Sequence, residues 1–229
     1  MNILALDSAG LILSIALETA NGVFYTEIDA GSRHSELLVE CAGELCKTAE
    51  LSPLCLKAVV CAKGPGSFTG LRIGYSAAKG YCFALGIPLI AISTLDSMAY
   101  PLSVWPGIVL PAIDAKKGCF FTALYRNGNR ISDYLDASPE IILKSAEKAA
   151  ISPNEPIIIT GSGANMLYSC LSKLVPARSI KINPRFRMGL AKELLEMSKK
   201  IIITGVNGID SGPDYIRKSD AELMMTSKI

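Results

Sequence analysis

Residues 63–74 read Lys-Gly-Pro-Gly-Ser-Phe-Thr-Gly-Leu-Arg-Ile-Gly. The apolar run 58–62 comes directly before this stretch, and a mostly apolar segment follows it to about residue 86. The order predicts a buried strand, a glycine loop and a helix, which together can present backbone N–H groups to an anion at the helix start. Ser67 and Thr69 belong to the residue types that favour the N-cap position. The loop is therefore a candidate anion site.

The loop does not match the common site patterns. The phosphate-binding P-loop and the dinucleotide fingerprint both need glycine where this chain has Thr69. The serine-hydrolase elbow needs glycine two residues before and two residues after the serine, and Ser67 has Pro65 and Thr69 there. None of these three familiar site classes is therefore indicated.

The helix after the loop is rich in small residues. Its apolar positions recur at helical spacing, as Leu71, Tyr75 and Ala78 illustrate. Glycine inside a helix costs about 1 kcal/mol relative to alanine, so Gly74 and Gly80 indicate that something uses the space they leave. Small residues four apart allow another backbone to approach closely. That backbone belongs either to the same domain or to a helix of a partner.

Composition limits the function classes. Half of the 229 residues are hydrophobic, which allows a substantial core, and a net charge of +2 is too small to indicate nucleic-acid binding by itself. Seven cysteines without a CxxC pair, and no signal peptide, predict a reduced cytoplasmic protein. No apolar run reaches the roughly 18–20 residues that span a bilayer.

His34 is the only histidine, so a two-histidine metal site cannot form within the chain and a metalloprotease is disfavoured. A Ser-His-Asp site would also have to use His34. Because its neighbours are Arg33, Ser35 and Glu36, we expect His34 at the surface or as a helix cap.

Similar element patterns occur in both halves of the chain. Asn21-Gly22 and Asn127-Gly128 each predict a hairpin, and an αβ unit follows each hairpin. We expect a further helix from Pro184 to about Lys200. The pattern predicts an α/β protein with an N-terminal lobe at 1–103 and a C-terminal lobe at 104–229, whose tail, 212–229, packs back on the first lobe.

Residues 64–74, together with Ala78-Lys79-Gly80, resemble the signature of the bacterial TsaB (YeaZ) family. Supporting similarity spans almost the whole chain, at residues 3–7, 33–38, 92–95, 113–115 and 213–217. The resemblance implies an actin/Hsp70/sugar-kinase-like (ASKHA) fold with two duplicated lobes.

It further implies a non-catalytic subunit that dimerises with its catalytic paralogue TsaD. With a TsaE-like ATPase, that complex forms N6-threonylcarbamoyladenosine at position 37 of tRNAs reading ANN codons. The resemblance implies that tRNA is reached through the complex, that the free chain is a homodimer, and that no membrane is involved. The predicted partner interface comprises Gly70, Arg72, Ile73, Gly74, Ala77, Ala78, Gly80 and Tyr81.

The resembled fold also suggests an alternative, an independent ATPase or small-molecule kinase. Kinases of this fold hold Mg-nucleotide with two strand-end aspartates, here Asp7 and Asp114, and with hydroxyl-rich turns. Ser8 is the one hydroxyl of the first turn, which disfavours this alternative, and both aspartates are also readable as structural turn carboxylates. We expect no cofactor or metal, although ATP or ADP at the partner interface is a further candidate. The residues of a nucleotide loop would be Asp7, Ser8, Gly64, Gly66, Ser67 and Thr69.

Basic side chains give the least specific signal. Arg72 is a candidate to contact the loop, an anion or a partner, and solvent is the alternative. A second basic cluster either lies near tRNA in the complex or forms a solvated face; it comprises Arg178, Lys181, Arg185 and Arg187.

Overall fold

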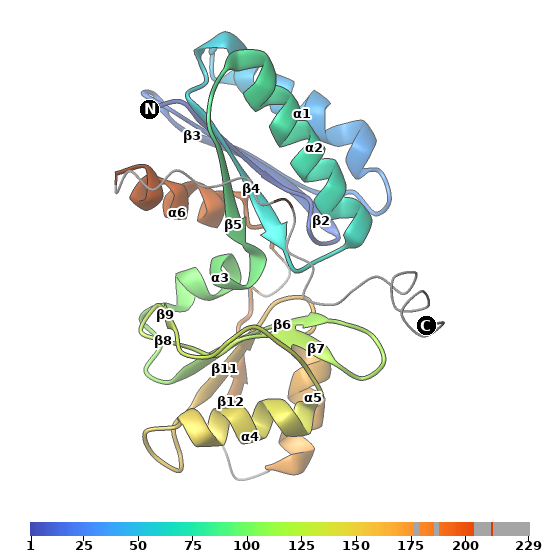
Figure 1. Ribbon diagram of the computed structural model, residues 1–229, viewed down its shortest axis with the longest axis vertical. Coiled ribbons are helices and arrows are strands. Elements are labelled where there is room, and N and C mark those ends of the chain that lie inside the picture. The colour runs from blue at the N-terminus through green and yellow to red at the C-terminus, as the bar shows by residue number, and fades with distance from the viewer. Residues whose placement is uncertain (176–178, 186–187, 204–211, 213–229) are drawn as a thin grey trace, which may run out of the picture.

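The protein is built from two lobes stacked along its long axis, each around its own sheet (Figure 1). The computed structural model describes residues 1–175, 179–185, 188–203 and 212.

The sheet of the first lobe has the order β3-β2-β1-β4-β5. β1, β2 and β3 pair antiparallel, whereas β4 and β5 continue the sheet parallel to β1. The turn between β2 and β3 lies at Asn21-Gly22, as predicted. The strands are β1 (Ile3–Asp7), β2 (Ile12–Thr19), β3 (Gly22–Asp29), β4 (Ala58–Gly64) and β5 (Leu89–Ser93).

The sheet of the second lobe repeats this plan. Its main path is β10-β7-β6-β11-β12, again with three antiparallel strands followed by two parallel ones. A small hairpin at Asn127-Gly128, formed by β8 and β9, pairs with β6. The repeated order confirms the duplicated, actin/Hsp70/sugar-kinase-like fold. The strands are β6 (Ile108–Asp114), β7 (Phe120–Thr122), β8 (Tyr125–Arg126), β9 (Asn129–Arg130), β10 (Leu135–Ala137), β11 (Ile157–Thr160) and β12 (Ile180–Ile182).

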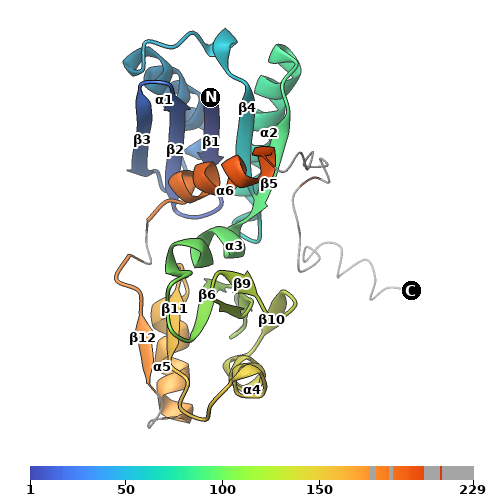
Figure 2. The same cartoon turned by 90° about the vertical axis from the view of Figure 1, so that its left-hand side faces the viewer.

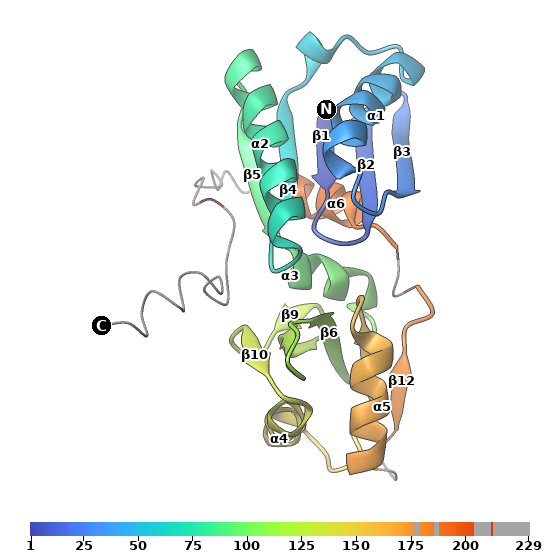
Figure 3. The same cartoon turned by 90° about the vertical axis from the view of Figure 1, so that its right-hand side faces the viewer.

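Helices cover both faces of each sheet. α1 (His34–Thr48) and α2 (Phe68–Leu85) lie side by side on the outer face of the first sheet (Figure 3). α4 (Pro139–Ala149) and α5 (Ala164–Leu174) cover the outer face of the second. Between the sheets lie α3 (Thr94–Ala99) and α6 (Ala191–Ile203). Among the described helices, none combines the length and the apolar character needed to cross a bilayer.

Helix α6 (Ala191–Ile203) corrects the predicted boundary between the lobes. It comes after the second lobe in the sequence but packs on the first sheet, where Leu194 and Leu195 join the buried side chains of β1 and β4 (Figure 2). The range 104–229 is therefore not one lobe. The helix also begins at Ala191 rather than at Pro184, because residues 183–185 and 188–190 have a non-helical conformation.

The start of α6 is held by three consecutive backbone N–H groups. Gly189 donates to Oε1 of Glu27 at 3.1 Å, and Leu190 donates to Oδ2 of Asp7 at 2.9 Å. Ala191 donates to Oγ of Ser14 at 3.0 Å. The first N–H groups of a helix have no partner inside the helix, and carboxylates are favoured at this positive end. Acceptors on β1, β2 and β3 thus fix α6 against the first sheet.

The glycines of the signature let α2 approach the turn between β1 and β2. A Cβ on Gly66 would lie 2.6 Å from the carbonyl oxygen of Ala9. A Cβ on Gly70 would overlap the carbonyl oxygen of Ser8, and one on Gly74 would overlap its hydroxyl. Ser8 in turn donates a 2.8 Å hydrogen bond to the carbonyl of Gly70. The four-residue spacing is therefore explained by packing within the lobe.

This packing predicts opposite effects for two glycines of α2. Gly70→Ala should lower the free energy of unfolding by about 1–3 kcal/mol, because backbone must move to admit the methyl group. Gly80→Ala should be neutral or stabilising by up to about 1 kcal/mol, because no atom lies within 4 Å of the added Cβ. Urea unfolding of both variants measures the difference, and equal stabilities would contradict the packing argument.

The two strand-end aspartates should also differ. Asp7→Ala leaves the N–H groups of Ala9 and Leu190 without their acceptor, which should cost about 1–3 kcal/mol of stability. Asp114 ends the equivalent strand of the second lobe, but it is partly exposed and pairs with Lys116, so Asp114→Ala should cost less than about 1 kcal/mol. Chemical denaturation tests this matched pair; an equal loss for both variants would show that Asp7 does not anchor α6.

Candidate functional site

An open groove separates α1 from α2 on the outer face of the first lobe. Both helices connect parallel strands, so their N-terminal halves lie at the same end of the lobe and line the groove together. Val39 and Phe68 expose 55% and 44% of their surface, and both line this one groove, so they form an apolar patch rather than isolated exposed residues. The groove is lined by Ser35, Leu38, Val39, Phe68, Thr69, Arg72, Ile73, Ser76 and Ala77.

The groove combines an apolar floor with polar groups at its rim. Leu38 is buried at its base, and Ile73 packs against the core of the lobe. The guanidinium of Arg72 lies 3.8 Å from the centre of the Phe68 ring, a cation–π contact that orients both side chains. An apolar centre with a polar rim is the composition expected of a protein-binding surface.

The structure places the residues of the predicted partner interface in different surroundings, some at the surface and some in the core. Arg72, Ile73 and Ala77 line the groove, whereas Gly80 is exposed and Tyr81 half-buried further along α2. Three predicted members are buried by their own lobe, so placing them on a partner-facing surface was wrong; these are Gly70, Gly74 and Ala78. The spacing of small residues shows that a backbone comes close, but not which one.

The predicted nucleotide loop is not assembled around one cavity. Ser8 is buried, and its hydroxyl donates a hydrogen bond to the carbonyl of Gly70. Gly64 is buried at the end of β4. Ser67 caps α2 by accepting the N–H of Gly70 at 3.2 Å, and its own N–H donates to the carbonyl of Ala9 at 2.7 Å. Thr69 faces the α1–α2 groove instead. The glycine loop therefore serves the junction between α2 and the β1–β2 turn.

Asp7 is the residue of this set that reaches the space between the lobes. Only 3% of its surface is exposed, and its two oxygens accept the N–H groups of Ala9 and Leu190. Burial raises the pKa of the Asp7 carboxyl, an effect opposed by those two N–H groups, by His34 and by the hydroxyl of Ser14. Both oxygens of Asp7 thus already have partners within the chain.

His34 is buried, with 6% of its surface exposed, so its expected surface position was wrong. It lies close enough to Asp7 to lower the pKa of that carboxyl, and its Nε2 accepts or donates no hydrogen bond among the described residues. The charged neighbours in the sequence point outward, while the first residue of α1 turns inward.

A cavity of about 170 Å³ lies between the lobes beside Asp7. Its walls are mainly apolar, and the Oγ1 of Thr94 is buried there without a hydrogen-bond partner among the described residues. Asp114 does not line it; a hydrogen bond with Lys116 lowers the pKa of Asp114 and holds that carboxyl in its own turn. The lining residues are Asp7, Ala9, Gly10, Leu11, Ile12, Asp29, Thr94, Met98, Ile113, Ser162, Met188 and Leu190.

Ser14 and Glu27 were missed as anchoring residues by the sequence analysis. Each lies inside a strand, and its partner on the α6 segment is more than 160 residues away, so no local pattern could identify it. Within the basic cluster, Lys181 is exposed near the Trp105 ring and Arg185 reaches the space between the lobes. Arg178, Arg187 and the tail 213–229 lie outside the described residues.

Several known proteins are similar to this chain in sequence or in fold. A family model described as "TsaD: tRNA N6-adenosine threonylcarbamoyltransferase" matches residues 22–184. The tRNA threonylcarbamoyladenosine biosynthesis protein TsaB of Bacillus subtilis (strain 168) is 27% identical over 230 residues, covering 97% of this chain and 96% of the relative. The TsaB protein of Escherichia coli (strain K12) is 34% identical over 129 residues, 55% of each chain.

A solved structure, YeaZ from Pseudomonas aeruginosa, has the same fold. It superimposes with a TM-score of 0.78 and covers 94% of this chain and 99% of its own length at 22% identity. The matched family model spans well over half of the chain, and full-length similarity to a TsaB protein agrees with it. The chain therefore belongs to the TsaB (YeaZ) family.

Proposed function

We propose that this protein is the non-catalytic subunit of a complex that forms N6-threonylcarbamoyladenosine at position 37 of tRNAs reading ANN codons. Its role is to dimerise with a TsaD-like catalytic paralogue through the α1–α2 groove. Similarity to proteins named for tRNA threonylcarbamoyladenosine biosynthesis supports the pathway. The match to a TsaD family model supports the relationship with the catalytic paralogue.

The observation that carries the proposal is the exposed groove itself. Val39 and Phe68 leave apolar surface open between two helices, and Arg72 stands at the rim. A paralogue of the same fold offers an equivalent pair of helices, and two helix pairs can pack groove to groove. In the free protein a second copy takes the same position, which gives a homodimer.

A scaffold role is also supported by the use of Asp7. In nucleotide-hydrolysing members of the wider fold, a strand-end aspartate at this place holds Mg-nucleotide. Here its two oxygens accept backbone N–H groups, and one of these belongs to the segment that leads into α6. The TsaE-like ATPase and tRNA then join the assembly through the catalytic subunit. Any ATP or ADP that this subunit binds lies at the interface with the catalytic paralogue.

The test introduces a charge into the groove at exposed positions. Val39→Arg and Ser76→Arg each place a long cation where the partner's helices would pack, while neither position is buried. Loss of one well-packed contact of this kind costs about 2 kcal/mol or more, a roughly 30-fold loss of affinity. Titration calorimetry with the purified TsaD-like paralogue measures that affinity, and the threonylcarbamoyladenosine content of tRNA should fall with it.

Val104→Arg is the matched control, because Val104 is 91% exposed on the second lobe. It should bind the paralogue as the wild type does. The proposal fails if both groove variants retain wild-type affinity, or if the control weakens binding as much as they do. Sedimentation of the isolated protein tests the homodimer, which the groove variants should dissociate.

A further inference from the structure

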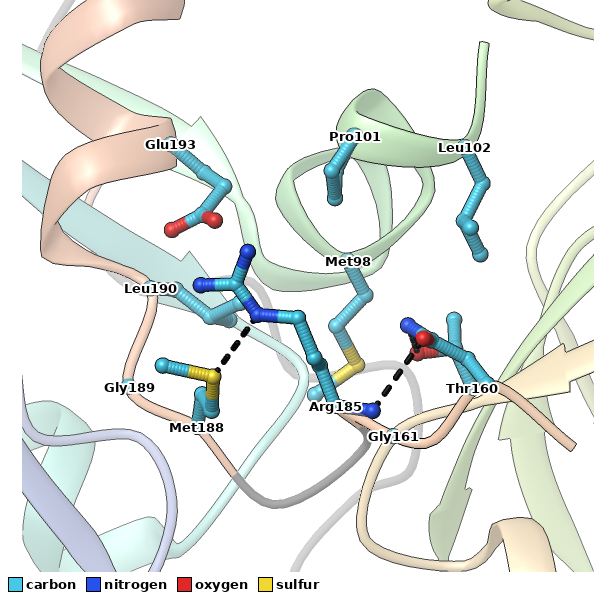
Figure 4. A pocket seen from close by; sticks show the side chains of 11 residues that line it. Met98, Pro101, Leu102, Thr160, Gly161, Arg185, Met188, Gly189, Leu190 and Glu193 are labelled. Atoms are coloured by element: carbon cyan, nitrogen blue, oxygen red, sulfur yellow. Dashed lines mark hydrogen bonds between the residues drawn. The ribbon is translucent and has the colours of Figure 1, made fainter. Parts of the chain in front are cut away.

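A second cavity between the lobes, of about 150 Å³, lies beside the segment that leads into α6 (Figure 4). Met98 of α3, with Pro101 and Leu102 of the short 3-10 helix η2 (Tyr100–Leu102), forms an apolar wall. The opposite wall is polar, with Arg185 and Glu193. The cavity is thus bordered by both lobes, and it is separated from the α1–α2 groove by the whole first sheet.

Glu193 has one carboxylate oxygen that the fold leaves without a donor among the described residues. Its Oε2 is buried and accepts no hydrogen bond among the described residues. Burial raises the pKa of the Glu193 carboxyl, while the guanidinium of Arg185 opposes this effect. A buried carboxylate oxygen without a donor is costly, so such an atom indicates a missing partner.

The neighbouring carboxylates are already engaged. Asp7 accepts the N–H groups of Ala9 and Leu190, and Glu27 accepts that of Gly189. Glu193 is the one of these three residues that lines this cavity, and its Oε2 has no donor among the described residues. This oxygen lacks a hydrogen-bond donor, and an ammonium group is a donor whose charge also matches a carboxylate.

Arg185 supplies the opposite charge. Its side chain extends across the cavity toward Glu193, and its Nε contacts the sulfur of Met188 at 2.9 Å (Figure 4). The remaining nitrogens of the guanidinium form a planar fork that matches a carboxylate. Asn183 and Thr160, which are also at the cavity, hydrogen-bond each other at 3.1 Å and so stay in place.

We propose that this cavity binds a small aliphatic α-amino acid, with the ligand's ammonium group on Glu193 and its carboxylate on Arg185. The apolar wall of Met98, Pro101 and Leu102 receives the side chain of the ligand. A cavity of about 150 Å³ favours a side chain of valine size over the larger indole ring.

L-Valine is the probe, titrated calorimetrically into the full chain. Saturable binding is expected for L-valine and not for L-tryptophan. L-Valinamide lacks the carboxylate and 3-methylbutanoate lacks the ammonium, so each should bind roughly 10-fold or more weakly than L-valine. Because these comparisons use the unmodified protein, they do not depend on the folding of a variant.

Substitutions then test whether Glu193 and Arg185 bind the two charged groups of the ligand. Glu193→Gln and Arg185→Gln should each weaken L-valine binding roughly 10-fold or more. Glu196→Gln, the same change one turn later on an exposed face of α6, should leave it unaltered. Absence of saturable L-valine binding at millimolar concentration overturns the proposal. So does equal binding of L-valinamide, or wild-type binding by Glu193→Gln.

Discussion

Two helices contact the turn at the end of β1, and the layered packing of the first lobe depends on these two contacts. On one side α2 packs onto Ser8 and Ala9, which requires that Gly66, Gly70 and Gly74 carry no side chain. On the other side Asp7 accepts the Leu190 N–H at the start of α6. Because α2 and α6 cover opposite faces of the sheet, this one turn fixes both layers of the lobe.

The second lobe has the same strand order but uses its equivalent turn differently. Asp114 ends β6 as Asp7 ends β1, yet its carboxylate is partly exposed and bonds to Lys116 within the same turn. No described helix begins on Asp114. The duplicated halves therefore share a topology, while the burial of the turn carboxylate is particular to the half that α6 covers.

Local sequence patterns predicted which helices and strands form. Contacts between residues far apart in the sequence determine where some of these elements begin and which side chains they bury. The Asn-Gly hairpins and the helix after the glycine loop follow from short-range sequence. The inward position of His34 and the start of α6 at Ala191 could not be predicted in this way. Pro184 is a favoured first residue of a helix, but the acceptors that stabilise the N–H groups of 189–191 lie on strands more than 160 residues earlier. The groove was predicted only through α2, since nothing in the sequence indicates that α1 forms its other wall.

The segment 188–190 links three features that are separate in the sequence. The N–H of Leu190 donates a hydrogen bond to Asp7. Met188 and Leu190 also line both cavities between the lobes. A large ligand such as a nucleotide would have to displace this segment and break hydrogen bonds to two carboxylates, each worth about 1.5–3 kcal/mol. A small ligand that fits beside the segment avoids that cost. The covalent path crosses between the lobes twice, before β6 and before α6, and α6 returns to the core of the first sheet. The anchored segment thus occupies part of the space between the lobes, whereas the groove between α1 and α2 on the outer face is open.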